Sequence, residues 1–332
     1  MLANTPADFR VGLLCGLAAH ALWGLMPLYF RAVAGVPPLE LLAHRIVWSL
    51  LFLVLLLTIQ GRWAVLFCTL GNPSTRYLLT LSSFLIAVNW FVFIYGVSIG
   101  QIVQNSLGYF INPLLNIFIG LLVFGERLRP AQWLAVGLAA CGLTYLVIAQ
   151  WQIPWIALSL ASSFSAYALI RKTTPVDALV GLTVETLFLT PVAGGMLTFW
   201  YFAGQSAVGQ FGWQVDGLLL LSGVVTAVPL LFFGAAARRL PMTVIGFLQY
   251  LAPSLQFLLA VLWLGEAFHP VQRVAFPIIW AALALVTVDS LLRNRRQVLT
   301  SDVEKKTVVI DEDGGECVLP SSPVIEGQGQ SN

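Results

Sequence analysis

The chain has 332 residues, of which 58% are hydrophobic and 10% are charged, and its formal net charge is +2. Together with a mean hydropathy of +0.86, this composition excludes an ordinary soluble domain and indicates an integral membrane protein. A helix needs about 20 apolar residues to cross the hydrocarbon core of a bilayer. Apolar runs of that length therefore mark the expected membrane spans.

Ten such runs follow one another along the chain, joined by short turns. They cover residues 10–31, 40–60, 76–98, 101–124, 131–149, 153–170, 178–203, 215–237, 242–265 and 271–292. The residues before the first run are too few and too weakly charged for a cleaved signal, so we expect this run to remain as a span. Residues 293–332 are polar and rich in Gly, Ser and Pro near their end, which predicts a disordered cytoplasmic tail.

An internal repeat relates the two halves of the chain. Residues 109–130 read YFINPLLNIFIGLLVFGERLRP, and residues 250–270 read YLAPSLQFLLAVLWLGEAFHP. A shift of 140 residues aligns Pro113 with Pro253 and Glu126 with Glu266. Both glutamates stand at the ends of apolar runs, where we expect them to fix loops.

The repeat also predicts how the halves enter the membrane. Residues 1–149 and 150–292 each contain five of the expected spans. Because five is an odd number, the second half must be inverted relative to the first, as in many secondary transporters. The predicted fold class is therefore an all-α integral membrane protein of ten transmembrane helices, arranged as two inverted five-helix repeats.

Basic residues set the expected orientation. With a cytoplasmic N-terminus, 14 of the 17 Lys and Arg residues fall on the inner side, and the exceptions are Arg31, Arg45 and Arg273. Positive residues accumulate on the cytoplasmic side of membrane proteins. We therefore expect a multi-pass protein of the cytoplasmic (inner) membrane with both termini in the cytoplasm.

Polar residues of the fourth and ninth spans share one helical face in each. They are Tyr109, Asn112 and Asn116 in the fourth span, and Gln249, Pro253 and Gln256 in the ninth. The prolines at 113 and 253 free a carbonyl four residues earlier, which lipid cannot satisfy. These kinked, polar faces, with the neighbouring Tyr250, predict a substrate pathway at mid-membrane. Hydrogen bonds that only hold the helices together are the alternative.

Two further groups are candidates for the same pathway. Asn89 and Trp90 lie deep in the third span and Trp23 lies deep in the first. Trp residues near the ends of spans are instead typical of the membrane interface.

Ionisable groups within the spans are His20, Arg45 and Glu185. Charges in the membrane are costly and usually have a functional or pairing role. We expect Arg45 to bind an anionic group or to pair within the outer half, and Glu185 or His20 to carry a coupling proton. The alternative is that Arg45 and Glu185 extend to opposite membrane surfaces. Inversion separates them by roughly 10 Å along the membrane normal, so a direct ion pair is not expected.

Several of these stretches resemble one family. The HALWG stretch at 20–24, VNW at 88–90, LGYFINP at 107–113, GER at 125–127 and QYLAP at 249–253 are similar to the EamA branch of the drug/metabolite transporter superfamily, and within it to RarD-type permeases. The resemblance covers about residues 10–293. It implies a ten-helix inner-membrane permease, often an exporter of metabolites or drugs, and leaves the substrate open.

The sequence contains no GxxxxGK[ST] phosphate loop and no HExxH zinc motif, so an enzyme is the least supported class. We expect no enzymatic activity, no cofactor, no metal and no nucleic-acid partner. The predicted function is a secondary transporter, with efflux of a small metabolite or drug-like solute by alternating access, coupled to protons or to exchange. The alternative is a channel-like facilitator or a scaffold that does not transport. The expected partners are the solute and the lipid bilayer, and a homodimer is left open.

Overall fold

The computed structural model describes residues 6–99, 102–148, 154–263, 273–274, 277–282, 284–286, 288–289, 308–310 and 316–318. Residues 1–283 form one compact unit, and residues 284–332 are assigned to another. In the second unit a short strand β1, Val308–Ile310, pairs antiparallel with β2, Glu316–Val318. The other residues of the predicted disordered tail lie outside the described part.

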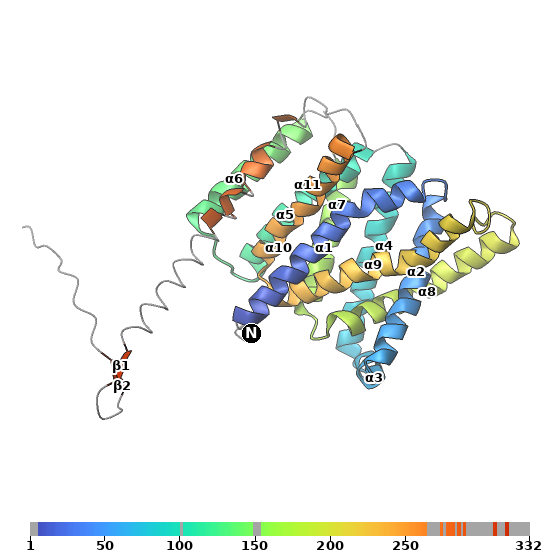
Figure 1. The fold of residues 1–332 in the computed structure, drawn as a ribbon, viewed down its shortest axis with the longest axis horizontal. Helices are drawn as coiled ribbons and strands as arrows, with labels where there is room; N and C mark the ends of the chain where they lie inside the picture. The colour runs from blue at the N-terminus through green and yellow to red at the C-terminus, as the bar shows by residue number, and fades with distance from the viewer. Residues whose placement is uncertain are drawn as a thin grey trace, which may run out of the picture. The chain divides into compact units, whose positions relative to one another are not determined.

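The first unit is built from helices (Figure 1). They are α1 Pro6–Ala32, α2 Pro38–Ile59, α3 Trp63–Gly71, α4 Pro73–Ser98, α5 Ile102–Val123, α6 Pro130–Ile148, α7 Trp155–Thr173, α8 Ala178–Phe202, α9 Trp213–Arg239, α10 Met242–Gln249 and α11 Leu251–Leu258, followed by a π-helical turn η1, Leu259–Trp263. Five of them, α1, α2, α4, α8 and α9, are long and apolar enough to cross a membrane.

These helices coincide with the first nine predicted spans to within a few residues. The short helix α3 was not predicted, because its nine residues are too few to cross a bilayer. The tenth predicted span is described only in pieces between residues 273 and 289. The structure is therefore that of a multi-span helical protein, and the count of ten spans stays a prediction.

Helix starts follow local sequence signals. Proline is the first residue of α1, α2, α4 and α6. It is favoured there because the first residue of a helix makes no intrahelical hydrogen bond through its N–H, which proline lacks. Asp177 caps α8, since its Oδ1 accepts hydrogen bonds from the backbone N–H groups of Leu179 and Val180 at 3.0 and 3.1 Å.

The two repeat prolines have different effects. Pro113 lies inside the unbroken helix α5. In the ninth predicted span the regular helical hydrogen bonding is interrupted at Tyr250, between α10 and α11, although the dihedral angles of Tyr250 stay helical (φ −65°, ψ −17°). Pro253 has no N–H for the Gln249 carbonyl four residues earlier, which explains the position of this break.

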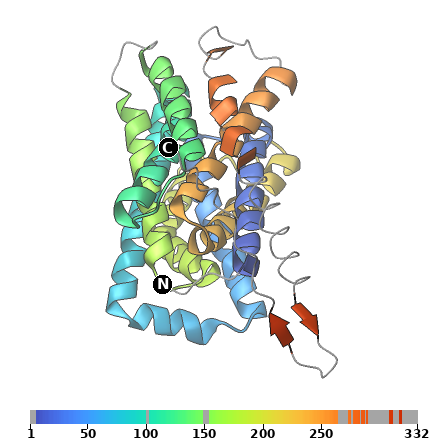
Figure 2. The ribbon, with the colours of Figure 1, turned by 90° about the vertical axis from the view of Figure 1, so that its left-hand side faces the viewer.

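Helices of the first half pack mainly on helices of the second half (Figures 1 and 2). Helix α1 contacts α9 and α11, α2 contacts α8 and α9, α4 contacts α7 and α8, and α5 contacts α7 and α10. The 140-residue shift carries α1 onto α7, α2 onto α8, α4 onto α9 and α5 onto the α10–η1 segment. The α1–α9 contact is thus equivalent to α4–α7, and α5–α7 is equivalent to α1–α11.

Small residues permit the closest of these approaches. A Cβ atom on Gly223 of α9 would overlap the backbone carbonyl group of Trp48 of α2. Beside it, the Ser49 hydroxyl donates to the Gly223 carbonyl oxygen at 3.1 Å. Where apolar side chains gain little by leaving lipid, such backbone packing and hydrogen bonding hold helices together.

The close packing of α2 on α9 predicts that a Gly→Ala substitution changes stability in opposite directions at Gly217 and at Gly223 of α9. Gly→Ala in a helix normally stabilises by about 0.5–1 kcal/mol. At Gly217, where an added Cβ meets no atom within 4 Å, we expect Gly217→Ala to be neutral or stabilising. Gly223→Ala must move α2 and is expected to destabilise by at least about 1–3 kcal/mol. Thermal unfolding of the purified variants in detergent measures both, and equal melting temperatures would contradict this packing.

Candidate functional site

A cavity of about 150 Å³ is lined by residues from α1, α2, α4, α5, α7, α9 and the α10–α11 segment. It lies beside the break at Tyr250, since residues on both sides of that break line it. The predicted pathway and charge residues on its wall are His20, Trp23, Arg45, Asn89, Trp90, Tyr109, Asn112, Gln249, Pro253 and Gln256. The tertiary structure therefore brings together residues from distant parts of the sequence.

Four of the proposed residues are not part of this wall. Asn116, Tyr250, Pro113 and Glu185 are absent from the lining. Asn116 is fully buried, and its Nδ2 donates to the Gln249 Oε1 at 2.6 Å. This amide pair ties α5 to α10, as the alternative of interhelical bonding expects.

The cavity wall also contains residues that sequence reasoning did not select. Phe30, Phe93, Phe164 and Thr226 line it. The apolar residues among them carry no distinguishing signal, because Phe occurs 21 times in the chain and aromatic residues face lipid, protein and cavity alike. Tertiary packing alone selects the ones that face inward.

Arg45 of α2 is the basic residue on this wall. Its Nε donates to the Thr226 Oγ1 at 2.8 Å. Its guanidinium carbon lies 5.6 Å from the ring centre of Phe30 and 5.9 Å from that of Trp90, within the range of cation–π attraction. Among the described residues, no carboxylate lies within ion-pair distance of it. Arg45 therefore faces the cavity rather than the outer membrane surface.

Amide groups on the wall are largely engaged with neighbouring helices. Asn89 donates to the Leu160 carbonyl at 2.8 Å, and Gln256 donates to the Trp23 carbonyl at 2.9 Å. Asn112 is 7% exposed and accepts from the Ser165 hydroxyl at 2.6 Å. Each of these bonds joins one half of the chain to the other, so these amides both line the cavity and position its walls.

His20 is almost fully buried on the cavity wall. Its Nδ1 lies 2.6 Å from the Gly16 carbonyl oxygen, and since a carbonyl only accepts, Nδ1 carries a proton. Its Nε2 is buried without a hydrogen-bond partner among the described residues. The ring also packs edge-on against Trp23, with 5.3 Å between centres.

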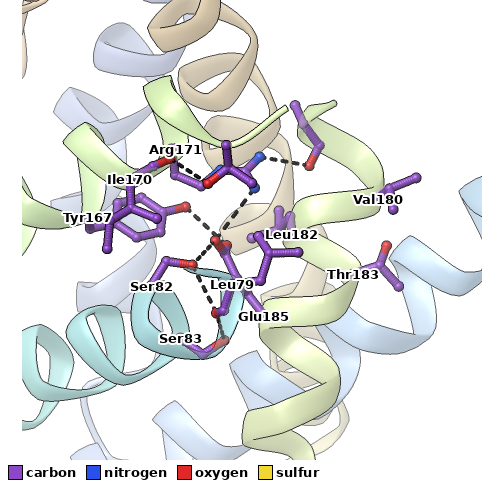
Figure 3. A network of polar contacts seen from close by, with 12 residues as sticks. Leu79, Ser82, Ser83, Tyr167, Ile170, Arg171, Val180, Leu182, Thr183 and Glu185 are labelled. Atoms are coloured by element: carbon purple, nitrogen blue, oxygen red, sulfur yellow. Dashed lines mark hydrogen bonds and ion pairs between the residues drawn. The ribbon is translucent and has the colours of Figure 1, made fainter. Parts of the chain in front are cut away.

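Glu185 of α8 forms a buried ion pair away from the cavity (Figure 3). Its Oε1 lies 3.5 Å from the Arg171 Nη1 of α7, and both side chains are 1% exposed. The Ser82 hydroxyl donates to Oε1 at 2.6 Å and the Tyr167 hydroxyl to Oε2 at 3.3 Å. The alternative that Glu185 extends to a membrane surface is therefore wrong.

Arg171 is one of the basic residues that the positive-inside pattern places on the inner side, and the structure buries its side chain. It is 2% exposed, and a Cβ on Gly181 would collide with its guanidinium group. Gly181 follows Arg171 by ten positions and Gly234 also borders the guanidinium. Such a pocket cannot be read from a sequence, since nothing in the chain order links these glycines to an arginine.

Comparisons with known proteins agree with this architecture. A sequence model of the EamA-like transporter family matches residues 10–148. An uncharacterized transporter of Vibrio cholerae is 42% identical over 86% of this chain and 94% of its own length. Protein RarD of Escherichia coli (strain K12) is 43% identical over 86% of this chain and 97% of its own. The chain belongs to the EamA-like transporter family.

Two other comparisons bear on subfamily and fold. A chloramphenicol-sensitive protein RarD of Pseudomonas aeruginosa is 33% identical over 86% of this chain and 96% of its own length. One solved structure, 19% identical, superimposes with a TM-score of 0.63 over 83% of this chain and 97% of that chain. The first supports a RarD-type member, and the second shows the fold alone. The chain is thus a multi-pass membrane transporter of the RarD type.

In this transporter, two groups of polar contacts join loops and helix ends of the first half to the second half. Glu126 accepts from the first turn of α10, with its carboxylate 2.7 Å from the Met242 N and 2.9 Å from the Thr243 N. Arg62 pairs with Asp177 at 2.9 Å. In the other group, Glu40 accepts from the Ala207 N at 2.7 Å. Glu126 has the expected loop-fixing role, and Glu266 lies outside the described residues.

The buried pair predicts a stability effect that a surface carboxylate would not show. Glu185→Gln leaves the Arg171 charge uncompensated, and we expect a loss of about 3–5 kcal/mol. The double variant Arg171→Met/Glu185→Leu removes both charges and is expected to regain most of the stability. Melting temperatures and the yield of monodisperse protein in detergent test this. A double variant as unstable as Glu185→Gln would contradict the pair as the cause.

Proposed function

We propose that this chain is a secondary transporter that exports a small metabolite or drug-like solute across the cytoplasmic membrane by alternating access, coupled to protons or to exchange. One observation carries the proposal. A cavity with polar groups on its wall lies between helices of both halves, beside a proline-containing helix whose regular hydrogen bonding is interrupted at Tyr250. Backbone groups left without a helical partner inside a membrane protein are tolerated where they face protein or a cavity, and transporters bind solutes beside such helices.

Inverted repeats are the second part of the proposal. The equivalence of the α1–α9 contact with α4–α7, and of α5–α7 with α1–α11, supports a two-fold relation between the halves. In an inverted arrangement, one set of contacts opens as its equivalent closes, while the cavity stays near the middle. This is the geometry that alternating access requires.

The loop contacts supply candidate gates on either side. Each joins the first half of the chain to the second, through Glu126 and α10, through Arg62 and Asp177, and through Glu40 and Ala207. The Arg62 and Asp177 side chains are 34% and 26% exposed, so their pairing is worth little and is easily broken. We assign the end with Arg62, Lys172 and Arg238 to the cytoplasm because basic residues concentrate there.

The proposal predicts that transport depends on the cavity wall. Asn112→Leu removes a buried amide of α5 and is expected to abolish solute movement, with stability lowered by only about 1 kcal/mol. Mass spectrometry of cells and medium, comparing a deletion strain with one overexpressing the chain, identifies the solute and its direction. Gln210→Leu, which removes an exposed amide outside the cavity, is the control and should behave as the unchanged protein. A solute that moves equally with Asn112→Leu would contradict the proposed pathway.

Coupling separates a secondary transporter from a channel-like facilitator. We expect the solute gradient built by the overexpressing strain to collapse when a protonophore is added or when the exchange partner is withdrawn. Movement that only follows the solute's own gradient, unchanged by either treatment, would favour the facilitator.

A further inference from the structure

The charge of Arg45 is not balanced by any described residue of the cavity wall. The Nε atom is used by Thr226, whereas no described residue accepts from the two terminal nitrogens. Phe30 and Trp90 flank the guanidinium and restrict its motion. An arginine fork held in this way can form two parallel hydrogen bonds with a carboxylate.

The buried Arg171 shows what a neutralised arginine looks like in the same protein. It has Glu185 at 3.5 Å and lies closed off among glycines. A charge within the membrane is costly unless it is paired or hydrated. Arg45 differs because it lines a cavity and has no described counter-charge there. The missing partner is best supplied by a ligand.

The side-chain amide of Gln249 provides a second hydrogen-bond donor on the cavity wall without a partner among the described residues. The Gln249 side chain is 5% exposed, and its carbonyl oxygen is occupied by Asn116. Its Nε2 is buried without a hydrogen-bond partner among the described residues. Unpaired buried donors cost about 1–3 kcal/mol each. In this amide orientation, which also leaves the Asn116 Oδ1 without a partner among the described residues, Nε2 is a second donor beside the cavity.

The remaining wall is aromatic and the cavity is small. Trp23, Trp90, Phe93 and Phe164 contribute rings to it. A cavity of comparable volume, about 150 Å³, holds one benzene molecule in an engineered protein. The apolar part of the ligand is therefore about the size of one six-membered ring or one branched chain.

We propose that this cavity binds a small organic monoanion, with its carboxylate on the Arg45 fork and its apolar body between the aromatic side chains. A dianion would leave one charge uncompensated, and a cation would meet Arg45 without a described carboxylate on the wall. The inference names a substrate class and rests on the proposed transport function. Binding of the anion itself does not require that transport occur.

Thermal unfolding of the purified full chain in detergent, with matched carboxylate and carboxamide probes, tests the inference. The pairs are benzoate and benzamide, phenylacetate and phenylacetamide, and isovalerate and isovaleramide, which differ in charge at nearly constant shape. We expect at least one carboxylate to raise the melting temperature by about 2–4 °C and its carboxamide to have no effect.

Variants of two arginines assign the effect to the fork. Arg45→Gln should weaken carboxylate binding at least about tenfold, and Arg45→Lys should retain part of it. Arg10→Gln, which changes an exposed arginine of α1, is the matched control and should bind as the unchanged chain does. If Arg45→Gln does not fold, two measurements still test whether Arg45 binds the carboxylate. They are the comparison of carboxylate with carboxamide probes on the unchanged chain and the titration of Arg45→Lys with the carboxylate.

The inference is overturned if no carboxylate of the panel binds, if a carboxamide binds as well as its carboxylate, or if Arg45→Gln binds unchanged. Flux measured in proteoliposomes separates this from the proposed function. A carboxylate that binds through Arg45 and does not cross the membrane would overturn transport and leave the anion site. Transport of a neutral or cationic solute, unaffected by Arg45→Gln, would overturn the anion site and leave transport.

Discussion

Inside a bilayer, every polar group that leaves water must find its partner within the protein, and this requirement organises the whole chain. Backbone groups are satisfied by forming helices, and side-chain groups are satisfied by bonds between helices. Here those bonds run between the halves, as in Asn116 to Gln249, Asn89 to Leu160 and Gln256 to Trp23. The halves are therefore interleaved, and the cavity between them has walls whose positions depend on the same hydrogen bonds that hold the fold.

The two buried arginines illustrate how this requirement separates structure from function. Arg171 pairs with Glu185 and donates to the Ala178 carbonyl in a pocket shaped by glycines, and it is closed to solvent. Ser82 and Tyr167 in turn donate to Glu185. The contribution of Arg171 is to fix α7 against α8. Arg45 has one hydroxyl partner and two aromatic neighbours, and it opens onto a cavity. The two guanidinium groups are chemically identical, but only the charge of Arg45 lacks a described counter-charge. We therefore expect Arg45, and not Arg171, to bind an anionic ligand.

The broken ninth span has a similar double role. The missing N–H of Pro253 interrupts the helix between α10 and α11, which places Gln249 at a helix end beside the cavity. Glu126 from the other half caps the start of α10 by accepting hydrogen bonds from the backbone N–H groups of Met242 and Thr243. Both ends of this short helix therefore contact the first half of the chain, its start through Glu126 and its end through the bond between Asn116 and Gln249.

By itself, the sequence determined the class of protein, the positions of nine helical segments, the internal sequence repeat, the family and most of the polar residues on the cavity wall. Hydropathy, proline and repeat spacing are local properties, so they can be read along the chain. Only the tertiary structure decided that Glu185 pairs with Arg171, that Asn116 bonds to Gln249 without itself lining the cavity, and which aromatic side chains face inward. It also interrupted the ninth span while leaving Pro113 within a continuous helix. These outcomes depend on which helices meet, and side chains that meet across two different helices leave no local pattern in the sequence, whether they are close in the chain, as Arg171 and Glu185 are, or 133 residues apart, as Asn116 and Gln249 are.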